Sequence, residues 1–286
     1  MAEPQAPALV VSFLTDYGLA DGFVGALHSV VRRHAPLAPI VDLTHEVAPQ
    51  NVRAGALALA RAAPYLAAGV VVAVVDPGVG TERRALAVRA RGGPPDGITF
   101  IGPDNGLLTP ALDALGGADA CVELEDRGYW LPTAGPTFAG RDIFAPAAAR
   151  LVCGAQLEDL GRPVTDQTLV RLPPPACRRL GHGSLEAEVT WVDRFGNVQL
   201  AAAPGDLPAD LVLPGQVLVT AKGARLGLAR RARAFADLGA GELGLIVDSY
   251  GHLALCLNGA SAAGQLGVSE ADLLVLSRPE GGLKSA

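Results

Sequence analysis

The first part of the chain alternates between short, continuously apolar runs and segments whose apolar residues recur at helical spacing. The apolar runs predict strands buried on both faces, and the amphipathic segments predict helices between them. Strands are expected at 9–16, 39–47, 69–80 and 98–108, and helices at 21–36 and 51–67. This alternation predicts an α/β domain with a mostly parallel sheet.

The pattern changes at VRLPPPACRRLGHG (170–183), where three consecutive prolines are followed by basic residues and glycines. Such a composition predicts a linker. Beyond it the helical spacing fades, and apolar segments separated by turn residues predict strands at 184–200, 216–228, 244–259 and 272–277. We therefore expect an α/β domain over 1–172, a linker over 173–183 and a β-barrel-like domain over 184–286.

Composition and charge exclude several classes of function. Half of the 286 residues are hydrophobic, so a sizeable core is available. The net charge is −6 and no basic stripe is present, which argues against nucleic acid or an anionic membrane as a partner. The longest apolar stretch contains Pro64 and Gly69 and stops at Asp76, so it is too short and too interrupted to span a bilayer.

The N-terminal charge pattern, short motifs and residue spacing bear on localisation and on the use of a metal or cofactor. No positively charged segment precedes the first apolar run, so we expect no secretory signal and a cytoplasmic protein. The histidines show no metal-ligand spacing, and no P-loop, GxGxxG or GxSxG motif follows a strand, so neither a metal nor a cofactor is predicted. We expect the four widely spaced cysteines to be reduced core residues, namely Cys121, Cys153, Cys177 and Cys256.

Polar residues follow several predicted strands, and the carboxyl ends of parallel strands converge on one crevice. The carboxylate of Asp16 suits a ribose diol, although its spacing favours a cap on the following segment. Asp76 precedes a turn that brings Arg83, or alternatively Arg84, back within reach, and the pair either holds water or an anion or is a structural ion pair. His45 is interpreted as a capping or core residue rather than a base.

Two turns of the second domain carry further candidates. VDRFGNVQL places Asp193, Phe195 and Asn197 around a turn. An aromatic ring can stack on a purine and an amide can bind its edge, although Asp, Gly and Asn are also common β-turn residues. DSYGHLALCLNG places Ser249 and Tyr250 ahead of a strand and allows the same two interpretations.

Together these motifs resemble the S-adenosylmethionine (SAM) hydrolases, also called SAM hydroxide adenosyltransferases, which are relatives of the fluorinase and chlorinase. The resemblance covers roughly residues 9–277 and rests on seven motifs in the same order, LTDYG…DGFVG, VDLTHEVAP, VVDPGVGTERR, PDNGLL, TFAGRDIFAPAAA, DRFGN and DSYGHLALCLNG. It implies a C-terminal β-barrel and a homotrimer whose sites lie between the N-domain of one subunit and the C-domain of its neighbour. It also implies attack on the ribose C5′ of SAM by water, giving adenosine and methionine.

The resemblance assigns roles in substrate binding by position. It implies that Asp16 holds the ribose hydroxyls. It implies that Phe195 and Asn197 contact the adenine, helped by backbone groups near Asn258 and Gly259. The amino and carboxylate groups of the methionine part are assigned to Asp193 and Ser249, and Tyr250 is a further candidate for substrate binding.

The resemblance also assigns the chemistry. Asp76 and Arg83 match two members of an Asp–Arg–His set that positions and polarises water, and the halogenating relatives do not keep that set. The histidine position falls at Ala139, just before a predicted glycine turn and helix. Three explanations are open: an engineered alanine, a slow hydrolase, or room for a halide or larger nucleophile. The alternatives to hydrolysis are an impaired or non-catalytic trimer that binds SAM or adenosine, and adenosyl transfer to another nucleophile.

Overall fold

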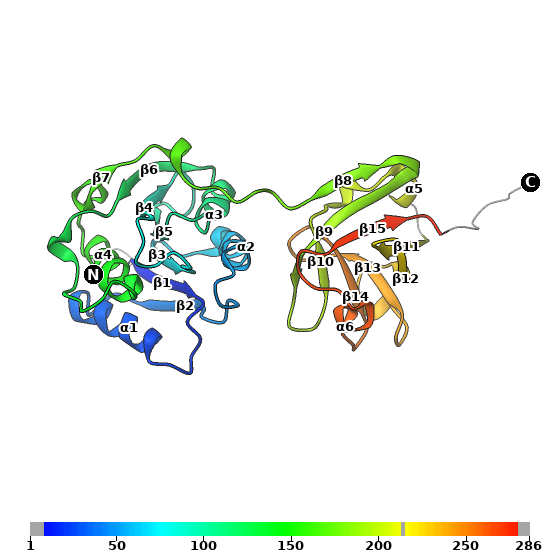
Figure 1. Cartoon of the computed structure of the whole chain (residues 1–286), viewed down its shortest axis with the longest axis horizontal. Helices are drawn as coiled ribbons and strands as arrows, with labels where there is room; N and C mark the ends of the chain where they lie inside the picture. Colours follow the sequence, from blue (N-terminus) through cyan, green and yellow to red (C-terminus); the bar gives the residue numbers. More distant parts are fainter. Residues whose placement is uncertain (1–8, 213–214, 280–286) are drawn as a thin grey trace, which may run out of the picture. The chain divides into compact units, whose positions relative to one another are not determined.

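The computed structural model describes residues 9–212 and 215–279 and divides into two compact units between Leu172 and Pro173 (Figure 1). The N-terminal unit is built on a seven-stranded sheet with the order β2-β1-β3-β5-β4-β6-β7. Its strands are β1 (Val10–Thr15), β2 (Ile40–Thr44), β3 (Gly69–Val74), β4 (Ala85–Ala90), β5 (Ile98–Pro103), β6 (Ala118–Glu123) and β7 (Arg162–Pro163). The first four strands in this order, β2, β1, β3 and β5, pair in parallel, and β4, β6 and β7 add antiparallel pairs. The predicted α/β domain with a mostly parallel sheet is confirmed.

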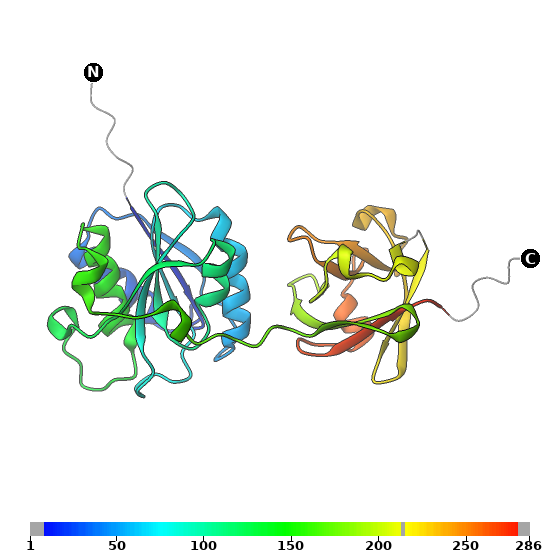
Figure 2. The same ribbon diagram turned by 90° about the horizontal axis from the view of Figure 1, so that it is seen from above.

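Helices cover both faces of this sheet (Figure 2). The helices α1 (Phe23–His34) and α4 (Ala145–Val152) pack together on one face, and α2 (Val52–Ala62) and α3 (Thr109–Ala114) pack together on the other. Every residue of β3 is buried, which explains why this strand is apolar throughout rather than alternating. The sheet therefore places the carboxyl ends of β1 and β3 side by side, directly before Asp16 and Asp76.

The segment before α4 differs from its prediction. A glycine turn is predicted there before the helix, but residue 139 is already helical, and Gly140–Phe144 form a π-helical turn that continues into α4. A side chain at Gly140 would place its Cβ 2.6 Å from the hydroxyl of Tyr17. Glycine is therefore needed here for close packing, and π-turns of this kind occur often at functional sites.

The C-terminal unit is a closed barrel. Its sheet has the order β10-β14-β13-β12-β11-β15-β9-β8, and the additional pairing of β10 with β9 closes the first seven of these strands on themselves. The predicted barrel-like domain is confirmed. The strands are β8 (Cys177–Leu180), β9 (Ser184–Val192), β10 (Val198–Leu200), β11 (Gln216–Ala221), β12 (Ala224–Arg231), β13 (Leu243–Val247), β14 (Leu253–Leu257) and β15 (Leu273–Ser277).

Short helices and one added strand complete this unit. The helix α6 (Ala262–Leu266) follows β14, and α5 (Ala209–Val212) follows β10. The expected linker segment, 173–183, contains β8, which pairs with β9 outside the closed ring. The barrel is filled by aliphatic side chains, such as Val189, Leu200 and Leu255. In β9 the buried residues alternate with partly exposed ones, whereas β10 and β14 are buried throughout.

The cysteines divide into two groups. Cys121 and Cys256 are buried, and burial raises the pKa of their thiols to about 12 and about 11, respectively. Cys153 and Cys177 are exposed, so the expectation of four core cysteines is wrong for these two. Within residues 9–212 and 215–279, none of the helices combines the length and the apolar composition that crossing a membrane requires.

Candidate functional site

The strongest candidate group in the N-terminal unit is the ion pair between Asp76 and Arg83. Asp76 follows β3, and a tight turn closed by the Val79 and Thr81 amides returns the chain so that Arg83 lies just before β4. The Nε of Arg83 donates to both carboxylate oxygens of Asp76 at 3.0 Å, and its Nη2 donates to Oδ2. Asp76 leaves only 5% of its side chain exposed, so this is a nearly buried, two-point ion pair.

Arg84, the alternative partner for Asp76, points elsewhere. It pairs with Asp104 and donates to the carbonyl oxygen and hydroxyl of Thr168. Because neighbouring residues before a strand project to opposite sides, only one of the two arginines can face Asp76. The turn thus produces two ion pairs of similar burial, with the side chain of Asp104 also 5% exposed.

The guanidinium of Arg83 is held on a second side by the ring of Phe144, whose centroid is 5.4 Å from Cζ. Asp76 occupies Nε and Nη2, while Nη1 has only a long contact of 3.5 Å to the carbonyl of Arg84. Arg83 also lines a cavity of about 540 Å³. The N–H groups of Nη1 and the second N–H of Nη2 are therefore the donors from which a water or an anion in this cavity could accept.

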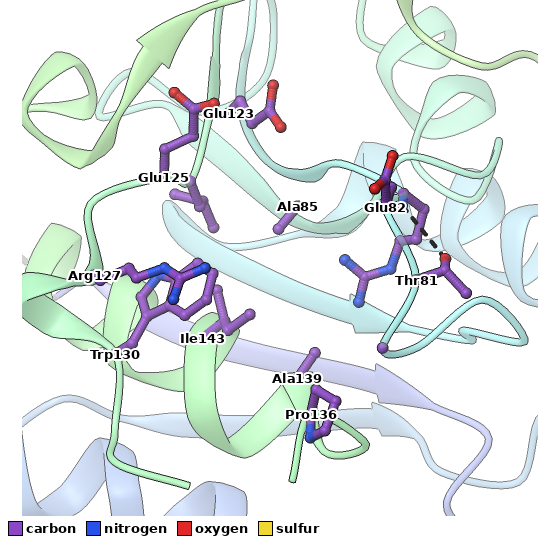
Figure 3. Close-up of a pocket in the computed structure, with 13 residues that line it drawn as sticks. Thr81, Glu82, Ala85, Glu123, Glu125, Arg127, Trp130, Pro136, Ala139 and Ile143 are labelled. Carbon is purple, nitrogen blue, oxygen red and sulfur yellow. Dashed lines mark hydrogen bonds between the residues drawn. The ribbon is translucent and has the colours of Figure 1, made fainter.

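Ala139 lines the same cavity as Arg83 (Figure 3). It lies with Pro136 on one side of the cavity, and Glu123 and Glu125 lie on the opposite side. The structure thus brings Arg83 and Ala139 together at one hollow, next to Asp76. The side chain at 139 is a buried methyl group, so this position supplies no proton acceptor.

Tyr17 packs beside this group. Burial raises the pKa of Tyr17 well above its usual value, and the carboxylates of Asp16 and Asp76 raise it further. Its ring meets Phe23 and Phe138 edge to face or tilted. A phenol in this environment stays protonated at neutral pH and can donate a hydrogen bond but cannot act as a base.

Asp16 shows features of both interpretations given to it. Its Oδ2 accepts a hydrogen bond of 2.8 Å from the backbone amide of Gln50, so it anchors the loop before α2. Gln50 itself has a φ of 64°, a strained value for a residue with a side chain. The other oxygen, Oδ1, receives no hydrogen bond within the described part of the chain, which leaves it able to accept from a ligand hydroxyl.

His45 is a core residue, as the sequence indicates. It is 4% exposed, and its Nδ1 lies 2.8 Å from Oγ1 of Thr15. Its Nε2 approaches Asp42, away from Asp76 and Arg83. His45 is therefore not part of the cavity lined by Arg83 and Ala139.

In the C-terminal unit, the turn between β9 and β10 is held by Asp193. Its Oδ1 accepts from the amides of Phe195 and Asn197 at 2.9 Å, and its Oδ2 accepts from the Asn197 side chain at 2.7 Å. Gly196 adopts a φ of 81° to close the turn. The result is a rigid turn that presents the ring of Phe195, which is 78% exposed.

Phe195 forms one wall of a cavity of about 580 Å³. Its lining is mostly apolar and comprises Phe195, Asn197, Phe235, Leu257, Gly259, Ala260 and Ser261. Two exposed rings with one amide suit a flat, weakly polar ligand such as a purine. Asn258, another predicted residue, donates its side-chain amide to the carbonyl of Leu238 and does not line this cavity.

The turn between β13 and β14 repeats the geometry of the 193–197 turn. The Oδ1 of Asp248 accepts from the amides of Tyr250 and His252 at 2.9 and 3.0 Å, and Gly251 also has a φ of 81°. Ser249 and Tyr250 are exposed at its tip. The two sequences DRFGN and DSYGH thus specify one turn, in which an aspartate binds the amides two and four residues ahead.

Two further residues belong to these groups and were not predicted. Phe235 lines the same cavity as Phe195, but it lies in the short helical turn Phe235–Asp237, where no periodic pattern marks it. Gln50 was missed because its role depends on a backbone amide, which any residue provides. A lone aromatic in a polar turn is the only sequence signal that could have indicated Phe235.

Known proteins resemble this chain over both of its units. Residues 11–161 match the family model of the SAM hydroxide adenosyltransferase N-terminal domain, and residues 187–275 match that of the C-terminal domain. The chain is 50% identical over 273 residues to the (R)-S-adenosyl-L-methionine hydrolase of Salinispora tropica, covering 94% of this chain and 98% of the relative. A more distant relative is the fluorinase of Actinopolyspora mzabensis, 31% identical over 89% of this chain and 92% of the relative.

A solved structure supports the same relationship. The crystal structure of an uncharacterised conserved protein from Thermotoga maritima aligns with a TM-score of 0.83 at 34% identity. It covers 94% of this chain and all of that protein, so both units of the fold are shared.

Proposed function

The chain belongs to the SAM hydroxide adenosyltransferase family, and from this premise we propose that it is a hydrolase that converts S-adenosyl-L-methionine and water to adenosine and L-methionine. The observation that carries the proposal is the buried two-point pair of Asp76 and Arg83, which leaves guanidinium N–H groups that Asp76 does not use at a cavity beside Ala139. Similarity to a named hydrolase at 50% identity, against 31% to a fluorinase, favours water over halide as the nucleophile. Neither a halide transferase nor a non-catalytic binder is favoured.

The reaction needs little covalent help from the protein. The oxygen of water forms a bond to C5′ of the ribose while the bond from C5′ to the sulfonium sulfur breaks, and the electron pair stays on sulfur. The leaving group is a neutral thioether, so no acid has to protonate it. One proton is released from the attacking water, which balances the positive charge lost from the substrate. The main tasks of the protein are alignment and exclusion of bulk water.

In this mechanism Arg83 binds the attacking water and Asp76 positions Arg83. The carboxylate fixes the plane of the guanidinium by two-point contact, and Phe144 supports its face. Because Ala139 offers no base, the water proton passes to solvent through the cavity. General-base assistance contributes about 10²–10⁴-fold, so its absence predicts a slow enzyme rather than an inactive one.

Substrate recognition is proposed to use both units. Asp16 accepts hydrogen bonds from the ribose hydroxyls through its unoccupied oxygen. Phe195 and Asn197 bind the adenine, with backbone groups near Asn258 and Gly259. The methionine part is held by Asp193, Ser249 and Tyr250. A carboxylate has about four lone-pair sites, and Asp193 uses three of them within its own turn, so one remains for the substrate.

We also propose the assembly and location that the family resemblance implies. The N-terminal unit carries the ion pair, and the C-terminal unit carries the exposed rings, so neither alone provides a complete site. A homotrimer, in which the N-terminal unit of one subunit and the C-terminal unit of the next form each site, would supply both halves. The cytoplasm is the proposed location, and no cofactor is proposed because the sulfonium is already an activated leaving group.

The stereochemistry at sulfur can be specified further. The relative from Salinispora tropica is named for the (R)-epimer of S-adenosyl-L-methionine. We propose the same preference here. Incubation with each sulfonium epimer separately should show faster adenosine formation from the (R)-epimer, and equal rates would contradict the preference.

The reaction is tested by incubating the purified protein with SAM in oxygen-18 water, with and without chloride. Mass spectrometry should find the label at the 5′-oxygen of adenosine under both conditions. Chlorinated deoxyadenosine would instead show a halide transferase. Bound, unreacted SAM would show a binder, and an unlabelled adenosine would exclude attack by water at C5′.

A further inference from the structure

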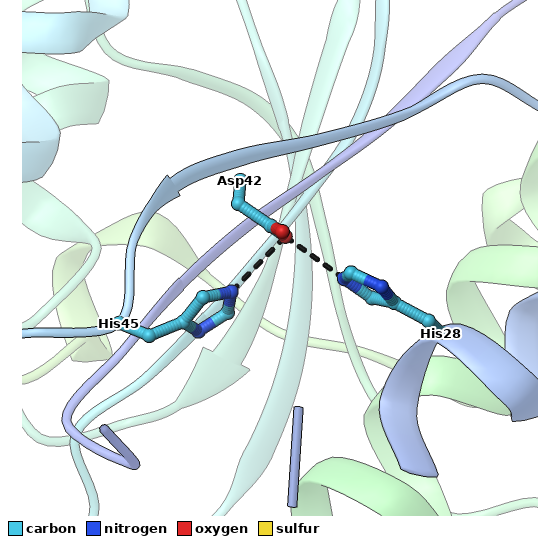
Figure 4. A group of neighbouring side chains, drawn as sticks. All are labelled: His28, Asp42 and His45. Atoms are coloured by element: carbon cyan, nitrogen blue, oxygen red, sulfur yellow. Dashed lines mark hydrogen bonds and ion pairs between the residues drawn. The ribbon is translucent and has the colours of Figure 1, made fainter. Parts of the chain in front are cut away.

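The cluster of His28, Asp42 and His45 is separate from the cavity lined by Arg83 and has no part in the proposed hydrolysis (Figure 4). His28 comes from α1, Asp42 from the edge strand β2, and His45 from the turn that follows β2. One ligand atom of each residue lies within 4.8 Å of the others. Three separate elements therefore bring two imidazoles and a carboxylate to one point.

The two imidazoles converge on a single oxygen. The Nε2 of His28 lies 2.9 Å from Oδ1 of Asp42, and the Nε2 of His45 lies 3.0 Å from the same atom. Zn²⁺ forms bonds of about 2.0–2.2 Å to such ligands, which separates tetrahedral neighbours by about 3.4 Å. The two nitrogen–oxygen separations are shorter than this by about 0.4–0.5 Å, so the carboxylate and the imidazoles would have to move apart to admit an ion among the three atoms.

The state of His45 points to a cation rather than to a hydrogen-bonded triad. Its side chain is only 2% exposed, and its Nε2 lies 3.0 Å from Oδ1 of Asp42 without a well-aligned hydrogen bond to any group in the part of the chain that the structure describes. Its other nitrogen, Nδ1, lies 2.8 Å from Oγ1 of Thr15. When Nδ1 donates to Thr15, a buried lone pair on Nε2 faces a carboxylate, an arrangement that is repulsive unless a cation lies between them.

The surroundings also match a metal site. A ligating histidine usually donates its second nitrogen to an oxygen that fixes the ring, and Thr15 occupies that position for His45. The side chains of His28 and Asp42 are 32% and 39% exposed, so one side of the cluster is open to a water ligand. Two imidazole nitrogens select a borderline transition metal over Mg²⁺ or Ca²⁺.

We propose that His28, Asp42 and His45 bind a divalent transition-metal ion of the Zn²⁺ type, completed by water. The ion would join α1 to the edge strand β2 and to the turn that ends the strand. The carbonyl of His45 also accepts from the amide of Gly18, so the same turn supports the loop that follows Asp16. The role is structural, and the site is one that histidine spacing along the sequence did not indicate because its ligands come from three elements.

The test is metal binding by the full-length protein without substrate, so its outcome does not depend on hydrolysis. Chelator-treated protein is titrated with Co²⁺ as a spectroscopic probe and then with Zn²⁺ in competition. The wild type should bind one equivalent per chain, with the visible absorption of a low-coordinate Co²⁺ site that Zn²⁺ abolishes. Its melting temperature should rise with metal.

Variants assign the ligands. His28→Gln and Asp42→Asn change partly exposed side chains and should weaken binding at least about 100-fold, while Thr15→Val should weaken it about 10- to 100-fold. His34→Gln is the matched control, because His34 lies exposed on the same helix as His28 and outside the cluster. His45→Gln is less informative because that side chain is buried. The proposal is overturned if the wild type binds no stoichiometric metal, or if His28→Gln and Asp42→Asn bind as the wild type does.

Discussion

The two units differ in how their charged side chains are paired and in which groups they leave for a ligand. Around Arg83, the charged side chains are nearly buried and neutralise each other, and the guanidinium N–H groups that Asp76 does not use are left for a ligand. In the C-terminal turns, the aspartates bind the backbone instead, and the groups left for a ligand are exposed rings. The first arrangement suits a reaction that needs a fixed donor, and the second suits binding of a flat ligand. Changes in the first should therefore alter kcat, and changes in the second should alter KM or stability.

The largest effect is expected at Arg83. Arg83→Lys keeps the charge but cannot make the two-point contact with Asp76 or keep a fixed donor at the cavity. We expect kcat to fall about 10²–10³-fold, with KM for SAM changed little. Steady-state kinetics of adenosine formation measures both constants.

Arg84→Lys is the matched control. Arg84 is the next residue after Arg83, and it pairs with the carboxylate of Asp104, which is as buried as that of Asp76. Both variants should lose a comparable free energy of unfolding, about 1–3 kcal/mol, measured by urea denaturation. Only Arg83→Lys should lose kcat. Equal losses of kcat in the two variants would mean that the Arg83 pair is structural, and the contrast between the units would then disappear.

The two similar turns of the barrel, 193–197 and 248–252, allow the cost of backbone strain to be measured separately from the cost of a packing clash. Gly196→Ala and Gly251→Ala impose the same unfavourable φ of 81°. A Cβ at Gly196 would lie 2.1 Å from Oγ and 2.7 Å from Cα of Ser261, whereas none of the atoms around Gly251 comes within 4 Å. Gly251→Ala should cost about 1 kcal/mol and Gly196→Ala about 1–3 kcal/mol more. Chemical denaturation of both variants measures these losses of unfolding free energy. Equal losses in the two variants would contradict the packing argument.

How far these features could be predicted from the sequence depended on the range of the interaction. The Asp76–Arg83 pair and the 193–197 turn are local, so turn residues predicted the turn, and spacing limited the partner of Asp76 to Arg83 or Arg84. The partner of Arg84 was not predictable, because Asp104 lies 20 positions away and becomes a neighbour only when β4 pairs with β5. For the same reason, the sequence did not predict that Phe235 lines the cavity of Phe195 or that His28 lies close to His45.

The fold shows the same dependence on range. Buried runs such as 69–80 predicted the central strands, because full burial requires apolar residues throughout. Strand β8 was hidden in the proline-rich stretch, since its exposed residues follow no apolar alternation and it is stabilised by pairing with β9. The pairing of β9 with β10 is a local hairpin across the 193–197 turn, but the pairings of β10 with β14 and of β9 with β15, which the closed barrel also requires, are long-range and have no composition signal.

A smaller effect, on KM, is expected at Phe195. Phe195→Ala removes the exposed ring while leaving the backbone bonds of Asp193 intact. Stacking on a base is worth about 1–3 kcal/mol, so KM for SAM should rise about tenfold with little change in kcat. Tyr65→Ala is the control, because Tyr65 is also an exposed ring, at 81%, but lies in the N-terminal unit. A fall in kcat at constant KM would show that the barrel takes part in the chemistry.

The smallest effect, and the one that tests the contrast most directly, is a gain at Ala139. Ala139→His adds a base beside Arg83, and the cavity of about 540 Å³ has room for an imidazole. Because the surroundings of residue 139 are built around a methyl group, we expect about a tenfold rise in kcat, below the range of an evolved base. The new activity should appear as pH rises through about 6.5, the usual pKa of histidine, since only the neutral ring accepts a proton.

The control for this gain is Ala139→Gln, which fills a similar volume and can hold water but cannot accept a proton near neutral pH. It should give neither the faster rate nor the new limb of the pH profile. If both variants accelerated the reaction equally, alignment of water would be the limiting factor, and the donor of Arg83 would be insufficient to provide it. If neither did, proton removal would not limit the natural reaction. The chain would then tolerate alanine because the charge lost as the sulfonium departs, rather than a base, lowers the barrier to attack by water.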